Sequence, residues 1–244
     1  EKIYHKVPNL FIVKTNFEII APAAGMPHGF RHNWGYSSIG VILAHVLGCD
    51  TLCFGSVLQE MFLGSKSNYI DVIERKTSGY NTNKEMINLA GLKFALPTGG
   101  ISEILTTKIA NEGKLQGVAS FCPNIDDNGT PCYKCWKCFR KIRLSGYAGI
   151  KPNETVYDVL SKRPIKQAPT VIYAVKKSNE LEYLPSTYHD IDVDFLENYY
   201  DYALENMMPN DLYVEVVSEL ERLNVKPMIE KDILRMQDIG EKLL

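Results

Sequence analysis

The sequence predicts an α/β protein with a mainly parallel sheet flanked by helices, a four-cysteine knuckle and a C-terminal helical region. Three observations lead to this prediction. Short apolar runs alternate with helical patterns across residues 10–111, four cysteines gather within residues 122–138, and helical spacing alone follows residue 152. Strands that alternate with helices favour parallel pairing, because each helix carries the chain back to the same end of the sheet.

The composition is that of an ordinary globular protein. Of 244 residues, 45% are hydrophobic and 23% are charged, and the formal net charge of -2 argues against non-specific nucleic-acid binding by the whole molecule. No apolar run reaches the roughly 20 residues of a membrane-spanning helix, and no secretion leader is visible. We therefore expect a soluble, cytoplasmic protein without a membrane partner. The first residue is Glu1 rather than Met, which leaves room for an earlier segment.

The first predicted strand covers residues 10–13, which are apolar and include β-branched side chains. A loop rich in Gly, Pro and His follows over residues 21–33. Residues 37–47 are predicted to form a buried helix that Gly48 ends, and residues 51–54 a second strand. This order predicts a strand–helix–strand unit with its two strands parallel.

The same alternation continues downstream. Residues 86–90 belong to a predicted helix, and residues 93–96 form a third predicted strand. Residues 98–100 form a glycine-rich turn, and residues 102–111 the helix that follows it. These elements extend the predicted sheet by one strand and add helices to cover it.

Beyond a predicted boundary at residues 146–152 the alternation ends. The sequence thus divides into an α/β domain, residues 1–149, and a helical C-terminal region, residues 150–244. Apolar residues then recur at helical spacing, the first set behind Asp194 as a helix cap. The two predicted helices carry Leu196, Tyr199, Tyr200, Ala203, Leu204 and Met207, and then Leu212, Val216, Leu220 and Leu223. We expect both helices to pack the C-terminal region onto the main domain.

Four of the six cysteines predict a metal site, because they cluster in a chain of intracellular type. Three of them stand at two-residue gaps, so backbone turns can point their sulfur atoms at one centre. Thiolates suit zinc, which is borderline soft and takes four ligands in a tetrahedral structural site. Turn-forming residues in the loop 123–131 let the first cysteine fold back onto the others, giving a knuckle over residues 122–140. The predicted zinc ligands are Cys122, Cys132, Cys135 and Cys138.

Two alternatives to zinc remain. An iron–sulfur cluster also takes four cysteines, but the ferredoxin run continues with a further cysteine, and residues 139–144 contain none. Buried thiols without a metal fit poorly with polar neighbours such as Lys134, Lys137 and Arg140. Zinc is therefore the favoured ion.

Basic and aromatic residues interleave over residues 134–143. Such a run can bind nucleic acid by pairing with phosphates and stacking on bases. It is more often a solvated face whose aromatic residues cover the knuckle, and the acidic net charge favours that interpretation. The run consists of Lys134, Lys137, Arg140, Lys141 and Arg143 around Trp136 and Phe139.

The order of these segments resembles the PP-loop ATPases, the HUP-like or adenine nucleotide alpha hydrolase-like superfamily. The closest likeness is to its 7-cyano-7-deazaguanine synthase branch. There a late cysteine, a Cys-x-x-Cys-x-x-Cys run and a nearby arginine hold a structural zinc. Residues 120–122, residues 131–138 and Arg140 are similar to that ending. Upstream, residues 31–33 before a helix and residues 55–56 after a strand are similar to the family in order and distance.

This resemblance, which spans residues 9–149, departs from the family at its defining motif. The Ser-Gly-Gly-x-Asp-Ser phosphate loop lies on the family's first strand, and nothing before Leu10 supplies it. The lysine expected at the helix start near Ser102 is also absent. Either an upstream segment is missing from the chain or ATP chemistry has been lost.

The resemblance implies an ATP-dependent enzyme, or part of one, with ATP, Mg and zinc as cofactors. Such an enzyme adenylates a small-molecule or nucleobase-like substrate for nitrogen or sulfur transfer. Arg31 and Asn33 would position the substrate, and Gly55 and Ser56 would line the adenosine pocket. The residues themselves identify no nucleophile or general base.

The turn of Thr98, Gly99 and Gly100 is a candidate phosphate loop, because glycines allow close approach and a helix start attracts anions. An ordinary strand-to-helix turn is the favoured interpretation. The alternative to an enzyme is a non-catalytic zinc-binding α/β module that contacts nucleic acid through residues 134–143. An oligomer is compatible with either function.

Overall fold

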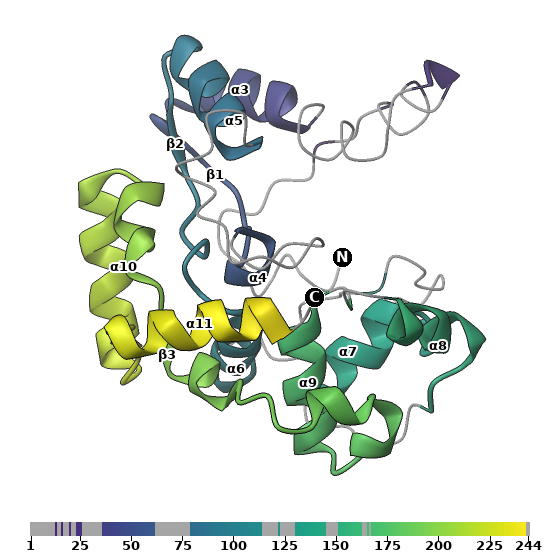
Figure 1. Cartoon of the computed structure of the whole chain (residues 1–244). Helices are drawn as coiled ribbons and strands as arrows, with labels where there is room; N and C mark the ends of the chain where they lie inside the picture. The colour runs from purple at the N-terminus through teal and green to yellow at the C-terminus, as the bar shows by residue number, and fades with distance from the viewer. Residues whose placement is uncertain are drawn as a thin grey trace.

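The computed structural model describes residues 13, 16, 20, 23–25, 36–61, 79–113, 122, 130–144, 151–162, 165 and 167–242. Within these residues the protein is mainly helical, and its strands pair only in twos (Figure 1). The α-helices are α3 (Tyr36–Leu47), α4 (Leu58–Met61), α5 (Gly79–Leu89), α6 (Glu103–Glu112), α7 (Trp136–Leu144), α8 (Glu154–Ser161), α9 (Ala168–Lys177), α10 (Asn210–Arg222) and α11 (Glu230–Lys242). The strands are β1 (Thr51–Cys53), β2 (Lys93–Ala95), β3 (Tyr199–Tyr200) and β4 (Lys226–Pro227). The 3₁₀ helices are η2 (Leu181–Tyr183), η3 (Ser186–Tyr188), η4 (Asp194–Glu197) and η5 (Tyr202–Met207). Among the helices described, none combines the length and the apolar character that a membrane crossing requires.

β1 and β2 form one parallel pair, with Thr51 opposite Lys93 and Cys53 opposite Ala95. In Figure 1, α3 and α5 lie beside this pair. α3 ends where Gly48 adopts a φ of +68°, a left-handed conformation that glycine reaches without strain. The helix before β1, both strands and the helix after β2 are therefore confirmed, and the two strands are parallel as predicted. The predicted burial of the first helix is wrong, because Ser37 and Ala44 are the buried residues of α3 and its apolar Ile42 and Val46 are exposed.

The predicted extended parallel sheet is wrong for the part of the chain that the structure describes. β1 and β2 contain three residues each, and no further strand joins them within that part. Directly after β2, the backbone N–H of Leu96 donates to the carbonyl of Met207 at 2.8 Å. Met207 is the last residue of η5, so the partner of the chain at this point is a 3₁₀ helix and not a further strand. Of the predicted strand 10–13, only Val13 is described, and it is exposed and outside any strand.

The predicted helix over residues 196–207 is also wrong. The chain there forms η4, the short strand β3 and η5 in succession, and β3 pairs in parallel with β4. Asp201 interrupts the helix, because its backbone N–H donates to Gly100 at 2.8 Å and its carboxylate accepts the Ala203 N–H at 2.8 Å. The helix predicted over residues 212–223 is confirmed as α10.

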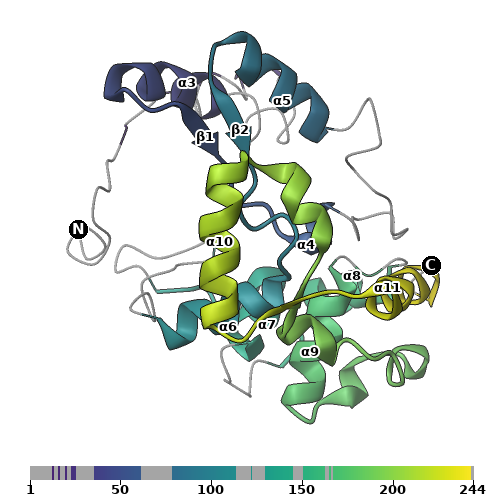
Figure 2. The ribbon, with the colours of Figure 1, turned by 90° about the vertical axis from the view of Figure 1, so that its left-hand side faces the viewer.

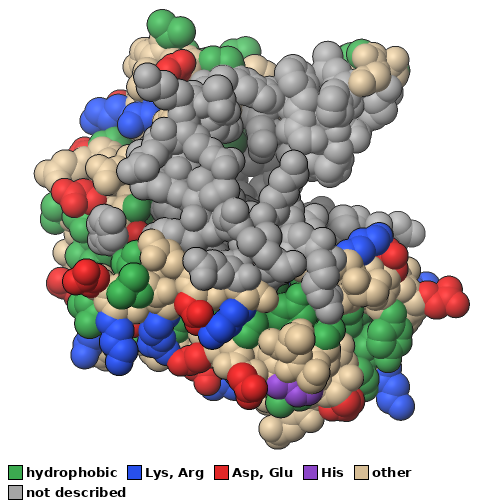
Figure 3. All heavy atoms as spheres, in the orientation of Figure 1, with side chains coloured by type: hydrophobic (Ala, Val, Ile, Leu, Met, Phe, Trp, Pro, Cys, Tyr) green, Lys and Arg blue, Asp and Glu red, His purple; other side chains and the backbone are tan. Residues whose placement is uncertain are grey.

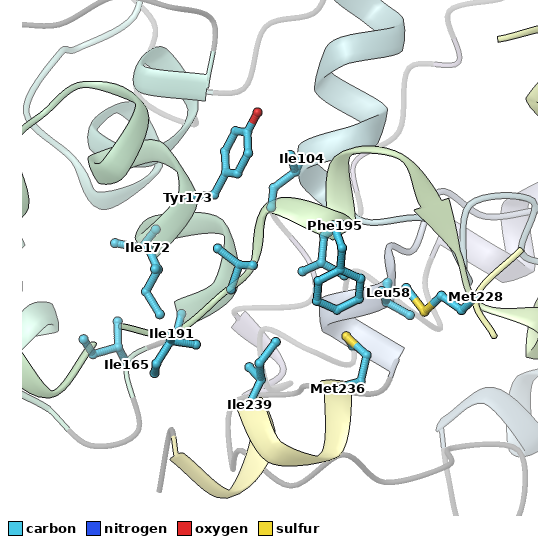
Figure 4. Packing of buried hydrophobic residues seen from close by; sticks show 14 of the residues in the cluster. Leu58, Ile104, Ile165, Ile172, Tyr173, Ile191, Phe195, Met228, Met236 and Ile239 are labelled. Carbon is cyan, nitrogen blue, oxygen red and sulfur yellow. The ribbon is translucent and has the colours of Figure 1, made fainter. Parts of the chain in front are cut away.

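The main hydrophobic core draws on both regions that the sequence separates near residue 150. Figure 4 shows Met236 and Ile239 of α11 pointing into the cluster that also contains Leu58, Ile172 and Phe195. A second cluster lies under α10, which in Figure 2 extends from the β1–β2 pair towards α6. Elements on the two sides of the predicted boundary thus bury each other's apolar surface.

Candidate metal centre

The four predicted zinc ligands meet at one point of the structure. Their sulfur atoms all lie within 4.8 Å of one another. Cys122 Sγ lies 3.9 Å from Cys135 Sγ, and Cys132 Sγ lies 3.8 Å from Cys138 Sγ. All four are free thiols, so no disulfide among them competes with a metal. We call this group the cysteine centre.

The start of α7 places two of the thiols. Cys135 directly precedes the helix and Cys138 follows three residues later, so both side chains lie on one side of its first turn. Tyr133 has a φ of +57°, and this left-handed residue turns the chain just after Cys132. The Cys132 N–H in turn donates to Cys122 Sγ at 3.4 Å, which brings the fourth thiol to the other three.

The cysteine centre has a sheltered side and an open side. Cys138 is fully buried and Cys122 is 6% exposed, whereas Cys132 and Cys135 are half-buried. A hydrogen bond from the Lys134 backbone N–H lowers the pKa of Cys132 to about 6. Burial raises the pKa of Cys135 and of Cys138. A bound cation offsets such a rise, because thiols bind metals as thiolates.

The sulfur geometry fits a single tetrahedral ion. With zinc–sulfur bonds of about 2.3 Å, a tetrahedron places its sulfur atoms about 3.8 Å apart. Two of the sulfur pairs, at 3.8 and 3.9 Å, already have that separation. A four-iron cluster binds each cysteine through a different iron atom, so it needs more widely spaced sulfur atoms. Four protein ligands also complete the coordination shell, which is typical of structural zinc.

Beyond the thiols, buried ion pairs tie α7 to the core. Arg140 Nη2 donates to Glu103 Oε1 at 3.0 Å, and Lys141 Nζ lies 2.7 Å from the same oxygen. Arg140 Nε lies 2.9 Å from Glu103 Oε2, although its N–H is not aligned for a hydrogen bond. Arg143 Nε donates to Glu180 Oε2 at 2.6 Å. Glu103 is 4% and Arg140 2% exposed, so these charges are almost fully removed from water.

The basic run of residues 134–143 therefore divides into two groups. Its last three cations are the ion-paired residues just described, while Lys134 and Lys137 are exposed. Trp136 stacks on the buried ring of Phe139, with ring centroids 5.9 Å apart, so these aromatic groups pack inward. On the face drawn in Figure 3, basic and acidic side chains of described residues are interspersed. The run mainly holds α7 in place and offers few cations to a phosphate backbone.

The residues that the family resemblance assigns to ATP are only partly described. Arg31 and Asn33 lie outside the described residues. The hydroxyl of Thr98 donates to the carbonyl of Ser56 at 2.6 Å, so two of the assigned segments do meet. This hydrogen bond joins the two turns to each other. Nothing in the described part of the chain supports binding of ATP or Mg.

Gly99 and Gly100 are buried against η5. A Cβ added at Gly99 would collide with Met207 Sδ, and one added at Gly100 would lie 2.7 Å from the carbonyl oxygen of Asp201. The same added Cβ would lie 2.9 Å from Leu204 Cβ. Glycine is needed here because protein backbone and side chains approach closely, which is the role of an ordinary packed turn.

Replacing Gly100 by alanine is expected to destabilise the protein by about 2 kcal/mol, within the usual range for overpacking a tight contact. The added methyl group meets a backbone carbonyl, which cannot rotate away as a flexible side chain can. Gly55→Ala is the control, since no atom lies within 4 Å of its added Cβ, and its stability should change by less than about 0.5 kcal/mol. Urea unfolding measures the stability of both variants. Equal unfolding midpoints for Gly100→Ala and Gly55→Ala would contradict the tight packing of the turn.

The chain is similar to a protein family that carries no functional assignment. The family model, described as "Family of unknown function (DUF6395)", matches residues 82–240, a range that contains all four cysteines of the centre. No curated protein and no solved structure matches the chain. The predicted membership of the PP-loop ATPases is therefore wrong. The matching family has no known function and is not the PP-loop ATPase family, and the two-stranded pairs described above do not build the parallel sheet of that superfamily.

Proposed function

The chain belongs to the family of unknown function DUF6395, and from its cysteine centre we propose that it is a zinc-binding protein. In this proposal the four thiolates hold one structural zinc ion, which fastens the start of α7 to the chain at Cys122. The observation that carries the proposal is the convergence of four free thiols, two pairs of them at tetrahedral separations. The role is structural, because four protein ligands leave zinc no open position for a substrate.

Among the residues that the structure describes, apolar packing around the thiols is too slight to hold this knuckle together. Besides the cysteines, the small cluster around the thiols contains Ile142 as its buried hydrophobic residue. Burying one such side chain contributes about 1.5–3 kcal/mol, whereas fixing the backbone costs roughly 1–2 kcal/mol per residue over the loop 130–135. Zinc binding contributes about 10–16 kcal/mol in zinc-finger peptides, which is sufficient to order such a loop.

The charges around the cysteine centre also suit a zinc–thiolate group. Zinc with four thiolates carries a net negative charge, and Cys135 and Cys138 place that charge at the N-terminus of α7. The N-terminal end of a helix favours negative charge, because its free N–H groups and its dipole point there. Lys134 and Lys137, which are exposed between the ligands, add two compensating cations.

Metal analysis of the purified full chain tests this proposal. We expect about one zinc per chain, retained through gel filtration, as four-thiolate structural sites do. Exchange with cobalt should then give the intense absorption of a tetrahedral cobalt–thiolate centre. Bound iron with visible absorbance would contradict the assignment of zinc. A folded chain that binds neither zinc nor cobalt would contradict the proposal as a whole.

A further inference from the structure

We propose that the cysteine centre is also a site of reversible oxidation by hydrogen peroxide, which closes two disulfides and releases the metal. This inference rests on the proposed zinc binding. The two bonds join Cys132 with Cys138 and Cys122 with Cys135. These are the sulfur pairs that lie 3.8 and 3.9 Å apart, and together they use every thiol of the cysteine centre.

Each pair combines a thiol that solvent reaches with one that the protein shelters. Cys132 and Cys135 are half-buried on the open side, while Cys138 and Cys122 are buried behind them. Oxidant-sensitive cysteines typically have this arrangement, an accessible thiolate next to a resolving thiol. A disulfide requires sulfur atoms about 2.05 Å apart, so each pair has to close by roughly 2 Å. Closure of that size is within reach of side-chain rotation and a small shift of the loop.

The oxidation proceeds by two substitutions at each pair. The Cys132 thiolate attacks one oxygen of hydrogen peroxide, the O–O bond breaks, hydroxide leaves, and the sulfur becomes a sulfenic acid. Cys138 then attacks that sulfur, so the S–S bond forms, the S–O bond breaks and a second hydroxide leaves. The two sulfur atoms lose two electrons, which reduce one peroxide, and solvent protonates both hydroxides to water. Repetition at Cys135 and Cys122 leaves zinc without thiolate ligands.

The rest of α7 keeps its place when the metal leaves. Phe139 belongs to the main core cluster, Arg140 is paired with Glu103, and Arg143 is paired with Glu180. These contacts lie on the helix beyond the thiols and do not depend on a metal. Oxidation therefore changes the knuckle locally, and reduction in the presence of zinc can restore it.

The two other cysteines allow a clean test. Cys49 and Cys53 are exposed, and the group of candidate metal ligands found among the described residues does not include them. The variant Cys49→Ser/Cys53→Ser keeps the cysteine centre and removes the thiols that would otherwise consume oxidant. It is compared with the wild-type chain throughout.

The experiment is a titration of the zinc-loaded double variant with hydrogen peroxide, in which released zinc and remaining thiols are measured. We expect complete loss of zinc and of all four thiols at about two equivalents of peroxide, with the far-UV circular dichroism retained. Peptide mapping should find Cys132 bonded to Cys138 and Cys122 bonded to Cys135. Dithiothreitol and added zinc should then restore the loaded protein.

Several results would overturn this inference and leave zinc binding untouched. They are zinc retained at excess peroxide, sulfinic acids instead of disulfides, a different pairing, or loss of the helical signal when zinc leaves. Release from the wild-type chain but not from the double variant would place the oxidation at Cys49 or Cys53 and would also overturn it. A chain that never binds zinc fails the metal analysis before the titration begins, and that result removes both proposals.

Discussion

Replacing Cys138 by serine is expected to abolish stoichiometric zinc binding. Cys138 is fully buried in the first turn of α7, with its Sγ 3.8 Å from Cys132 Sγ. A serine hydroxyl at position 138 is a far poorer zinc ligand than the cysteine thiolate. Losing a group that merely orients a ligand typically lowers metal affinity 10- to 100-fold, so losing a ligand should lower it by more than about 100-fold. Metal analysis after dialysis against a weak chelator measures the loss.

Cys53→Ser is the matched control for this experiment, since Cys53 is an exposed cysteine outside the cysteine centre. It should keep about one zinc per chain under the same dialysis, as an intact four-thiolate site does. Both variants should stay folded, because the buried ion pairs of Arg140 and Arg143 hold α7 without a metal. If Cys138→Ser bound zinc as tightly as the wild type, the metal would be held somewhere other than this centre.

Features that the sequence predicts correctly are set by residues close to one another along the chain. Gly48 ends α3 because it can adopt a positive φ, and Ser102 begins α6 because its hydroxyl accepts the Leu105 N–H at 2.9 Å. The cysteine spacing is equally local, since three of the thiols lie within residues 132–138. One turn of backbone is enough to bring these groups together, so their spacing alone predicts the geometry.

The extended sheet and the helix over residues 196–207 were predicted wrongly because distant contacts decide them. Apolar residues at helical spacing can be buried equally well by short 3₁₀ turns on either side of a strand. Here Tyr200 pairs with Pro227, and the Asp201 N–H bonds to Gly100, about a hundred residues away. Such partners are not visible in the local pattern. The family resemblance failed in a similar way, because a cysteine pattern specifies a metal site and not the sheet beside it.

Sequence reasoning also missed Glu103, the acceptor of two buried or half-buried cations. Charged residues are usually exposed, and the sequence separation of 37 positions from Glu103 to Arg140 hides their pairing. One signal was present: Arg140 and Arg143 lie three residues apart next to apolar Phe139 and Ile142, on what the structure shows to be the inner face of α7. A buried arginine on such a face requires a carboxylate from another element.

Glu103→Gln is expected to lower the free energy of unfolding by roughly 3 kcal/mol at neutral pH, as breaking a buried ion pair usually does. The amide keeps the shape of the side chain but removes its charge. Arg140, whose side chain is 3% exposed, is then left as an unpaired buried cation, and the partly exposed Lys141 loses its partner. Glu219→Gln is the matched control, since Glu219 pairs with Arg222 on the exposed surface and should change stability by less than about 0.5 kcal/mol.

The difference in unfolding free energy between the wild type and Glu103→Gln should depend on pH, and this dependence separates an ionic role for Glu103 from a merely steric one. Burial alone raises the pKa of Glu103, but the charges of Arg140 and Lys141 outweigh it and hold the pKa below its ordinary value. The stabilisation is therefore fully present above the pKa of the unfolded chain, about 4.3, and is lost as the pH falls through the lower pKa of the folded chain. Urea unfolding should show the widest gap between wild type and Glu103→Gln near neutral pH, narrowing below about pH 4. A gap that stays constant down to about pH 3 would mean that the lost stability comes from packing and not from the carboxylate's charge.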